Sequence, residues 1–266
     1  MNSKSTAPSA EQSDAFFQNF KHSFFPERPM ALALSSRSFD TVDAPEERGD
    51  AAVISKESPL VIAFADGVTG ENRQAVMNST QISERYANAN NDLNSDPIGW
   101  HTSYKECMGH CGWFMTGHNI DDHRTSNTSI TMDAVVLDII RVVAGPNVDT
   151  VMKLMGKVFD SLKTDEPIIN LFDRNSKSDS SGNARIVPCL QSASGIAVTY
   201  FVSIKCDFNR QVGGAWFWKW DVSDLKIKKM ATGVNLNLQH YRGREQAILE
   251  NLGANSDAFF NKLKLK

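Results

Sequence analysis

The chain has 266 residues, of which 41% are hydrophobic and 22% are charged, as in an ordinary globular domain. With 28 Lys+Arg against 31 Asp+Glu, its net charge of −3 excludes the strongly basic surface that binding to nucleic acid requires. The polar start MNSKSTAPSAEQSD lacks the apolar segment of a Sec signal peptide, and no stretch is apolar for long enough to cross a bilayer. We therefore expect a chain that is made in soluble form and keeps its four cysteines reduced.

A helix is predicted over residues 11–25, with Ser13 or Asp14 as its N-cap, and residues 1–11 are expected to be disordered. Its aromatic residues share one helical face: Phe16, Phe17, Phe20 and Phe24. Such a face either docks on its own domain or lies on a membrane surface, and the pattern favours docking.

A strand, a turn and a helix are predicted next. Leu60 to Ala65 form a continuous apolar run, and a helical pattern follows over residues 71–90. The turn between them either binds an anion at the helix N-terminus or is a plain turn in which Asp66 or Thr69 caps the helix. The chain has no phosphate-loop pattern there, which favours the cap. The acidic segment before the strand, residues 39–58, is expected to be a surface loop.

Cys107, His110 and Cys111 stand close together and suggest a metal site at first sight. At 100° per residue, however, a helix here carries both cysteines inside one apolar stripe. The stripe consists of Trp100, Tyr104, Cys107, Met108, Cys111, Phe114 and Met115. We therefore predict buried thiols and no metal, because structural zinc needs four converging ligands. The loop that follows offers a second choice for acid–base chemistry, formed by His118, Asp121, Asp122 and His123.

Two amphipathic helices are predicted within residues 129–145 and 146–163. Gly145 and Pro146 lie between them, as expected for a helix C-cap followed by a helix-starting proline. This pattern predicts an αα-hairpin. The polar segment 173–184 is expected to be a loop.

From Ala184 onward the period changes to that of β-strands. Strands are predicted over residues 184–193, 196–208, 214–223, 225–229 and 233–241, and helices over 244–253 and 256–266. The second and third strands are expected to pair as an antiparallel hairpin. Residues 12–266 are thus predicted to form a single α+β domain, with a mainly antiparallel β-sheet surrounded by α-helices.

Cys206 is the cysteine with the most distinctive position. It shares one strand face with Val198, Tyr200, Val202, Ile204 and Phe208, while Thr199, Ser203, Lys205 and Asp207 share the other. Three roles stay open for this thiol: core filler, carrier of an acyl group, and catalytic nucleophile. A nucleophile needs a histidine, a cation or a helix N-terminus to lower its pKa, and the strand pattern supplies none of these.

The layout of residues 130–252 resembles the Evf family of bacterial virulence factors. The resemblance rests on the αα-hairpin before a sheet and on the cysteine in VSIKCDF, just before a Gly-Gly-tryptophan strand. It implies an α/β fold of intertwined antiparallel strands wrapped by helices, and a palmitate-like fatty acid bound as a thioester to Cys206. It also implies membrane association and persistence in an insect gut. The expected location is the bacterial cytoplasm, with membrane association or release by a non-Sec route.

An enzyme is the alternative hypothesis. Cys206 would then act in a cysteine-dependent acyltransferase or hydrolase on acyl thioesters, with His110 or His240 brought near by folding. In either case the expected partners are a fatty-acyl group and a membrane surface, and not nucleic acid. Because one acyl chain gives only marginal membrane binding, a second contact is expected from the helix over 11–25 or from the C-terminal KLKLK.

Overall fold

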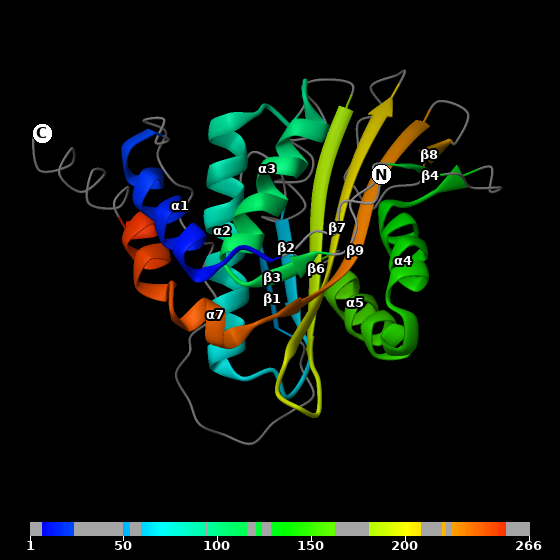
Figure 1. Cartoon of the computed structure of the whole chain (residues 1–266). Coiled ribbons are helices and arrows are strands. Elements are labelled where there is room, and N and C mark those ends of the chain that lie inside the picture. Colours follow the sequence, from blue (N-terminus) through cyan, green and yellow to red (C-terminus); the bar gives the residue numbers. More distant parts are fainter. Residues whose placement is uncertain are drawn as a thin grey trace, which may run out of the picture.

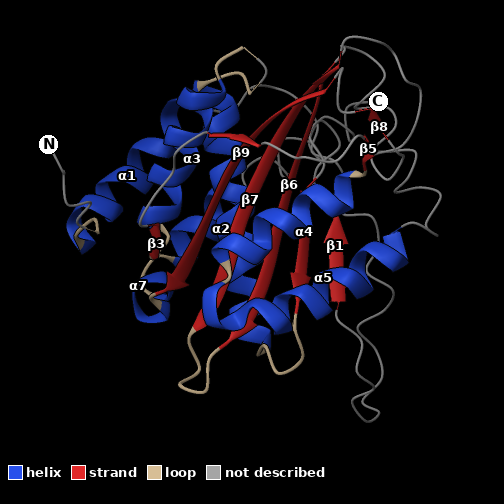
Figure 2. Ribbon diagram, turned by 90° about the vertical axis from the view of Figure 1, so that its right-hand side faces the viewer, coloured by secondary structure: helices blue, strands red, loops and turns tan. Residues whose placement is uncertain are grey.

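The structure is a computed structural model, and it describes residues 7–23, 50–53, 60–93, 95–115, 121–123, 129–162, 181–208, 220–221 and 225–253. A central β-sheet lies between two groups of helices (Figure 1). One side carries α1 (Ala10–Ser23), α2 (Gly70–Asn90), α3 (Pro97–His110) and α7 (Leu238–Arg242). The other side is covered by α4 (Met132–Val143) and α5 (Val148–Leu162), which lie in front of the sheet in Figure 2. The predicted α+β class is confirmed.

Seven strands of the described chain form the main sheet. They are β1 (Asp50–Val53), β2 (Leu60–Phe64), β3 (Trp113–Met115), β4 (Asp121–His123), β6 (Ser181–Gln191), β7 (Ala197–Phe208) and β9 (Leu225–Leu236). The order is β1-β2-β6-β7-β9, and both β3 and β4 pair with the outer edge of β9. Only β2 and β6 are parallel among these pairs. A separate small sheet pairs β5 (Ser129–Ile130) with β8 (Trp220–Asp221).

Both faces of the main sheet are buried, because strand residues alternate between two apolar cores. The α2/α3 core contains Leu60, Ile62, Trp100, Tyr104, Cys189 and Phe201, among others. The hairpin core, under α4 and α5, contains Val61, Val135, Ile140, Val158, Val202 and Cys206, among others. This explains why β2 is apolar at every position rather than at every second one.

The predicted αα-hairpin is confirmed. Helices α4 and α5 are joined by the short 3₁₀ turn η1 (Gly145–Asn147), where Gly145 adopts a left-handed φ of 52°. Tyr200 on β7 holds this turn against the sheet, since its hydroxyl donates to the Ala144 carbonyl over 3.2 Å. The Asn147 side-chain amide donates to the same hydroxyl over 2.7 Å.

The helix predicted through Met115 is shorter than expected. Helix α3 is capped by Cys111, and Gly112, at a φ of 94°, turns the chain into β3. A Cβ atom on Gly112 would lie 2.9 Å from the Asn237 carbonyl oxygen, so only glycine lets the two segments approach this closely. Phe114 is consequently 43% exposed on β3 instead of lying in the apolar stripe.

Three further expectations about the strands are wrong. Residues 50–53 of the predicted loop form β1. The partners of β7 are β6 and β9, and β8 pairs instead with β5. The segments 225–229 and 233–241 form one long strand followed by α7, because the strand period continues through residues 230–232.

Pro188 lies inside the sheet and not at its edge, because its strand β6 is placed between β2 and β7. Proline has no amide hydrogen, and the ladder to β7 skips the pairs of residues 187 and 188. The Thr199 hydroxyl donates to the Pro188 carbonyl over 2.8 Å, which partly replaces the missing ladder bonds. The predicted helix over 256–266 lies outside the described residues, whereas residues 245–253 are helical as expected.

A buried ion pair links the sheet to the α2/α3 layer. Arg185 on β6 is 1% exposed, and its Nη2 donates to Oε1 of Glu84 on α2 over 2.7 Å. The guanidinium also lies 5.0 Å from the ring centre of Trp100 on α3. One side chain therefore contacts both helices that cover this face of the sheet.

We predict that Glu84→Ala lowers the free energy of unfolding by about 3–5 kcal/mol, because it leaves the Arg185 charge buried without its carboxylate. The exposed pair Arg141 and Asp138 is the matched control, and Arg141→Ala should cost less than about 1 kcal/mol. Urea unfolding followed by tryptophan fluorescence measures both values. A Glu84→Ala protein as stable as the Arg141→Ala protein would contradict this role of the pair.

Candidate functional site

Cys206 lies near the end of β7 and is fully buried in the hairpin core. Its cross-strand neighbours are Ile227 on β9 and Gly182 on β6. Because glycine has no side chain, only Ile227 contributes one directly beside the thiol in this row of the sheet. The predicted apolar face of the strand is confirmed from Val198 to Cys206.

The surroundings of Cys206 do not activate its thiol. Burial, and secondarily the negative charge of Asp207, raise its pKa well above the usual value for cysteine. Among the described residues, the Cys206 side chain makes no hydrogen bond. A nucleophilic cysteine needs the opposite environment, with a base or a positive charge that favours the thiolate.

The two histidines considered as bases for Cys206 lie on the other side of the sheet, where α1, α3 and α7 meet (Figure 1). There they surround Ser13 of α1, whose side chain is fully buried. Ser13 Oγ lies 3.1 Å from Nδ1 of His110 and 3.2 Å from Nε2 of His240. We call these three residues the α1 clasp. No sequence signal predicts it, because its members are far apart in the chain and Ser13 reads as a helix cap.

The hydrogen bonds of the α1 clasp place one hydrogen on His240. His240 Nε2 lies 3.2 Å from the carbonyl oxygen of His110, which only accepts, so this nitrogen carries a hydrogen. When His110 Nδ1 carries no hydrogen, the Ser13 hydroxyl donates to it. Burial and the neighbouring His240 lower the pKa of His110 to about 4, and burial lowers that of His240.

Aromatic contacts complete the docking of α1. Phe16 stacks on the His110 ring at 4.0 Å between ring centres, and Phe20 stacks on Tyr86 of α2 at 5.4 Å. Phe17 and Phe20 are buried in the α2/α3 core. The aromatic face predicted for this helix therefore docks on its own domain here, while Phe24 lies outside the described residues.

The other thiols are buried core residues. Cys107 and Cys111 lie in the α2/α3 core, and burial together with a hydrogen bond to Cys111 raises the pKa of Cys107 well above its usual value. Cys189 lies in the same core, where burial raises its pKa to about 12. The described residues contain no group of three or more side chains placed to bind a metal ion.

Of the proposed acid–base loop, the structure describes the side chains of Asp121 and Asp122. Asp121 and Asp122 are exposed neighbours on β4, so their side chains point to opposite faces of that strand. His118 lies outside the described residues. At the start of α2, Thr69 Oγ1 accepts from the Asn72 amide, which confirms the predicted cap.

No protein-family model and no curated protein matches the sequence. Solved structures similar in fold include a delta-endotoxin, at 12% identity and a TM-score of 0.42 over 75% of this chain and 90% of that one. The Evf virulence factor is similar at 12% identity and a TM-score of 0.42, over 92% and 89%. The activated Cyt2Ba monomer from Bacillus thuringiensis subsp. israelensis is similar at 12% identity and a TM-score of 0.40, over 68% and 97%. The resemblance is weak and is one of fold.

The α1 clasp predicts a pH-dependent stability. Because folding lowers the pKa of His110 from 6.5 to about 4, the folded state loses stability as the pH falls from about 6.5 to about 4. Allowing for partial exposure of the ring, we expect the loss to reach roughly 1–2 kcal/mol. Urea unfolding at pH 7 and at pH 4.5 measures it. His110→Gln should lose less stability than the wild type over this interval, and equal losses in both proteins would refute the assignment.

Proposed function

We propose that this protein is a non-enzymatic lipid carrier, with a fatty-acyl group bound as a thioester to Cys206 and exposed to membranes when the hairpin opens. The single observation that supports this most is the place of Cys206, an unactivated thiol inside the hairpin core. The virulence role in an insect gut that the Evf resemblance implies stays a prediction.

The strand face next to Cys206 offers a hydrocarbon chain an apolar path. Ile204 and Val202 follow on the same face, and both are buried in the hairpin core. The path ends at Tyr200, whose hydroxyl is hydrogen-bonded to Ala144 and Asn147 at the turn η1. Tyr200 and Cys206 are six positions apart on the strand, which corresponds to about 20 Å. A palmitate-like chain lying along the strand would therefore be buried between the sheet and the hairpin.

Accommodating such a chain requires movement of the helices. The hairpin core is close-packed around Cys206, so the chain would displace side chains unless α4 and α5 shift away from the sheet. The hydrogen bonds of Tyr200 hold the hairpin at its η1 end, which favours opening at the end near Cys206. The same opening would release the acyl chain toward a membrane.

Membrane binding through one acyl chain is expected to be weak and reversible, although each buried methylene contributes about 0.8 kcal/mol. Among the described residues, no helix combines the length and the hydrophobicity needed to cross a bilayer. Stable attachment would thus need a second contact. Helix α1 could provide it only after undocking, because Phe17 and Phe20 are buried against α2 and α3.

Intact mass measurement tests the proposal directly. Protein purified from a bacterial host should carry a fatty-acyl mass that neutral hydroxylamine removes, since this reagent cleaves thioesters. Cys206→Ser should lack the added mass and bind less to phosphatidylcholine vesicles in a flotation assay.

Cys189→Ser is the matched control, because Cys189 is equally buried but lies in the α2/α3 core. It should keep both the acyl mass and the vesicle binding. If the wild-type protein has an unmodified mass, Cys206 is an ordinary core residue. If Cys206→Ser keeps the acyl mass, the lipid is attached to another residue.

A further inference from the structure

Helix α1 lies on the outer side of α2 and α3, and the main sheet lies on their inner side (Figure 1). Among the described side chains of α1, the buried and half-buried ones share one side of the helix, which we call its inner face: Ser13, Phe16, Phe17 and Phe20. The opposite side is polar and exposed, with Glu11 and Gln18. The aromatic face of this amphipathic helix is therefore hidden only while α1 stays docked.

Two histidines contact the inner face directly. In the α1 clasp, the Ser13 hydroxyl lies between Nδ1 of His110, at the end of α3, and Nε2 of His240 on α7. The Phe16 ring stacks on the His110 imidazole. Imidazole changes its charge near neutral pH, so the docking of α1 depends on groups that mild acid can titrate.

Other polar contacts of α1 do not depend on histidine. Arg244, which follows α7, donates from Nη2 to the Ala10 carbonyl over 2.8 Å and pairs with Asp14 at 3.1 Å. Asn251 Nδ2 lies 3.5 Å from the Phe17 carbonyl, the upper limit for a hydrogen bond. Neither the guanidinium nor the amide titrates in mild acid.

The described elements bring these charged or titratable groups around the clasp: Asp14 of α1, Tyr86 of α2, Glu106 of α3, and Arg244 and Glu245 after α7. Burial lowers the pKa of both clasp histidines; His240 lowers that of His110 further, and Arg244 lowers that of His240. Asp14 acts in the opposite direction, but its carboxylate is paired with Arg244. The described surroundings therefore disfavour a positive charge on either ring.

A proton on His110 also changes the contact with Ser13. A neutral Nδ1 accepts from the hydroxyl, whereas a protonated Nδ1 can only donate. Since His240 Nε2 also carries a hydrogen, two N–H groups would then meet at one hydroxyl oxygen. The attraction of an imidazolium to the Phe16 ring offsets part of this cost.

We propose that acid pH releases α1 and turns its inner face into a contact for a lipid surface. The released helix would lie at the boundary of water and lipid, with Phe16, Phe17 and Phe20 toward the acyl chains and its polar side in water. It would supply the second membrane contact that the proposed acyl carrier needs, but the release itself does not depend on an acyl group.

The direction of the effect follows from linkage. Docking lowers the pKa of His110 from 6.5 to about 4, so docking is fully favoured above pH 6.5 and is progressively lost toward pH 4. Between pH 7.5 and 5.0 this shift raises the ratio of released to docked α1 by up to about 30-fold. Because the ring is only half-buried, we expect a rise of about tenfold.

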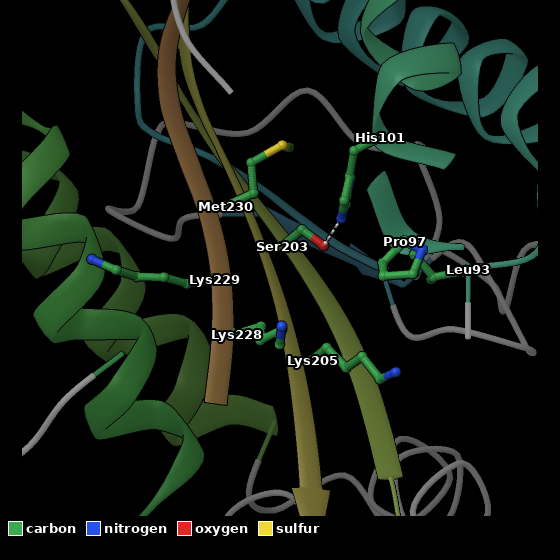
Figure 3. A pocket seen from close by; sticks show the side chains of 8 residues that line it. All are labelled: Leu93, Pro97, His101, Ser203, Lys205, Lys228, Lys229 and Met230. Atoms are coloured by element: carbon green, nitrogen blue, oxygen red, sulfur yellow. Dashed lines mark hydrogen bonds between the residues drawn. The ribbon is translucent and has the colours of Figure 1, made fainter. Parts of the chain in front are cut away.

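A second buried histidine on α3 provides an internal comparison. His101 is 5% exposed, and its Nε2 lies 3.1 Å from Ser203 Oγ on β7, where both line a small pocket (Figure 3). This hydrogen bond joins α3 to the sheet and not to α1. An effect of acid on His101 would thus loosen α3 and β7, whereas an effect on the clasp loosens α1.

Hydrogen–deuterium exchange of the whole protein at pH 7.5 and 5.0 tests the release. With rates corrected for the intrinsic exchange at each pH, protection in α1 should fall about tenfold at pH 5.0, because a free helix of 14 residues is marginal in water. Protection in β7 and β9 should stay the same. His110→Gln should reduce the loss in α1 to less than about threefold, and His101→Gln should leave it at about tenfold.

Unchanged protection of α1 at pH 5.0 would overturn the release. An equal loss in α1 and β7 would also overturn it, because the whole domain would then open. His110 is half-buried, so its variant should fold even where His101→Gln does not.

Flotation with phosphatidylcholine vesicles tests the partner, in a Cys206→Ser background that cannot carry the proposed thioester. The apparent affinity should rise about tenfold from pH 7.5 to 5.0, in proportion to the released fraction. Adding Phe16→Ser and Phe17→Ser together should keep binding low at both pH values, even if α1 undocks, because its inner face is no longer apolar. Ile98→Ser is the matched control, since Ile98 is 66% exposed on α3, and it should leave binding unchanged.

Equal acid-induced binding after loss of both phenylalanines would overturn the lipid contact, because another surface would then bind the vesicles. Release of α1 without vesicle binding would overturn it as well, and dimers at pH 5.0 would assign the inner face to a second copy of the chain. Acid-induced binding in Cys206→Ser supports the inference even when the wild type carries no acyl mass. The thioester proposal and this one can therefore fail separately.

Discussion

The register of β7 between β6 and β9 is the constraint on which the rest of the structure depends. Residues of even number on this strand face α4 and α5, and residues of odd number face α2 and α3. A slip of one residue would exchange the two sets. It would move Cys206 out of the hairpin core and Ser203 into it. The register thereby places Cys206 and Ser203 on opposite sides of one strand.

The ion pair of Arg185 and Glu84 helps to fix this register from the neighbouring strand. Arg185 fits only on the α2/α3 side of β6, where its guanidinium pairs with the Glu84 carboxylate and contacts the Trp100 ring. On the other side it would lie in the hairpin core, whose buried members are apolar. A buried ion pair contributes little net stability compared with an apolar pair, but a wrong register would leave its charges without partners. Its main effect is therefore on the choice between registers.

Local periodicity was sufficient to predict the αα-hairpin, the Thr69 cap and the apolar face of β7 that contains Cys206. Local periodicity did not predict the features that depend on contacts between segments far apart in the chain. The partners of β7 are β6 and β9 rather than the strand-like run that follows it in the sequence. Helix α3 ends early because Gly112 must pass close to Asn237. The α1 clasp and the hydrogen bond between Ser203 and His101 each join residues about 100 or more positions apart, so no spacing along the chain marks them.

The most direct test of the central claim is hydrogen–deuterium exchange of the acylated protein before and after treatment with neutral hydroxylamine. If the acyl chain on Cys206 lies in the hairpin core, as the β7 register requires, its removal should change exchange in α4 and α5 over residues 132–162. Exchange in α2 and α3, over residues 70–110, should stay the same. A change confined to α2 and α3, or no change in either layer, would contradict the account.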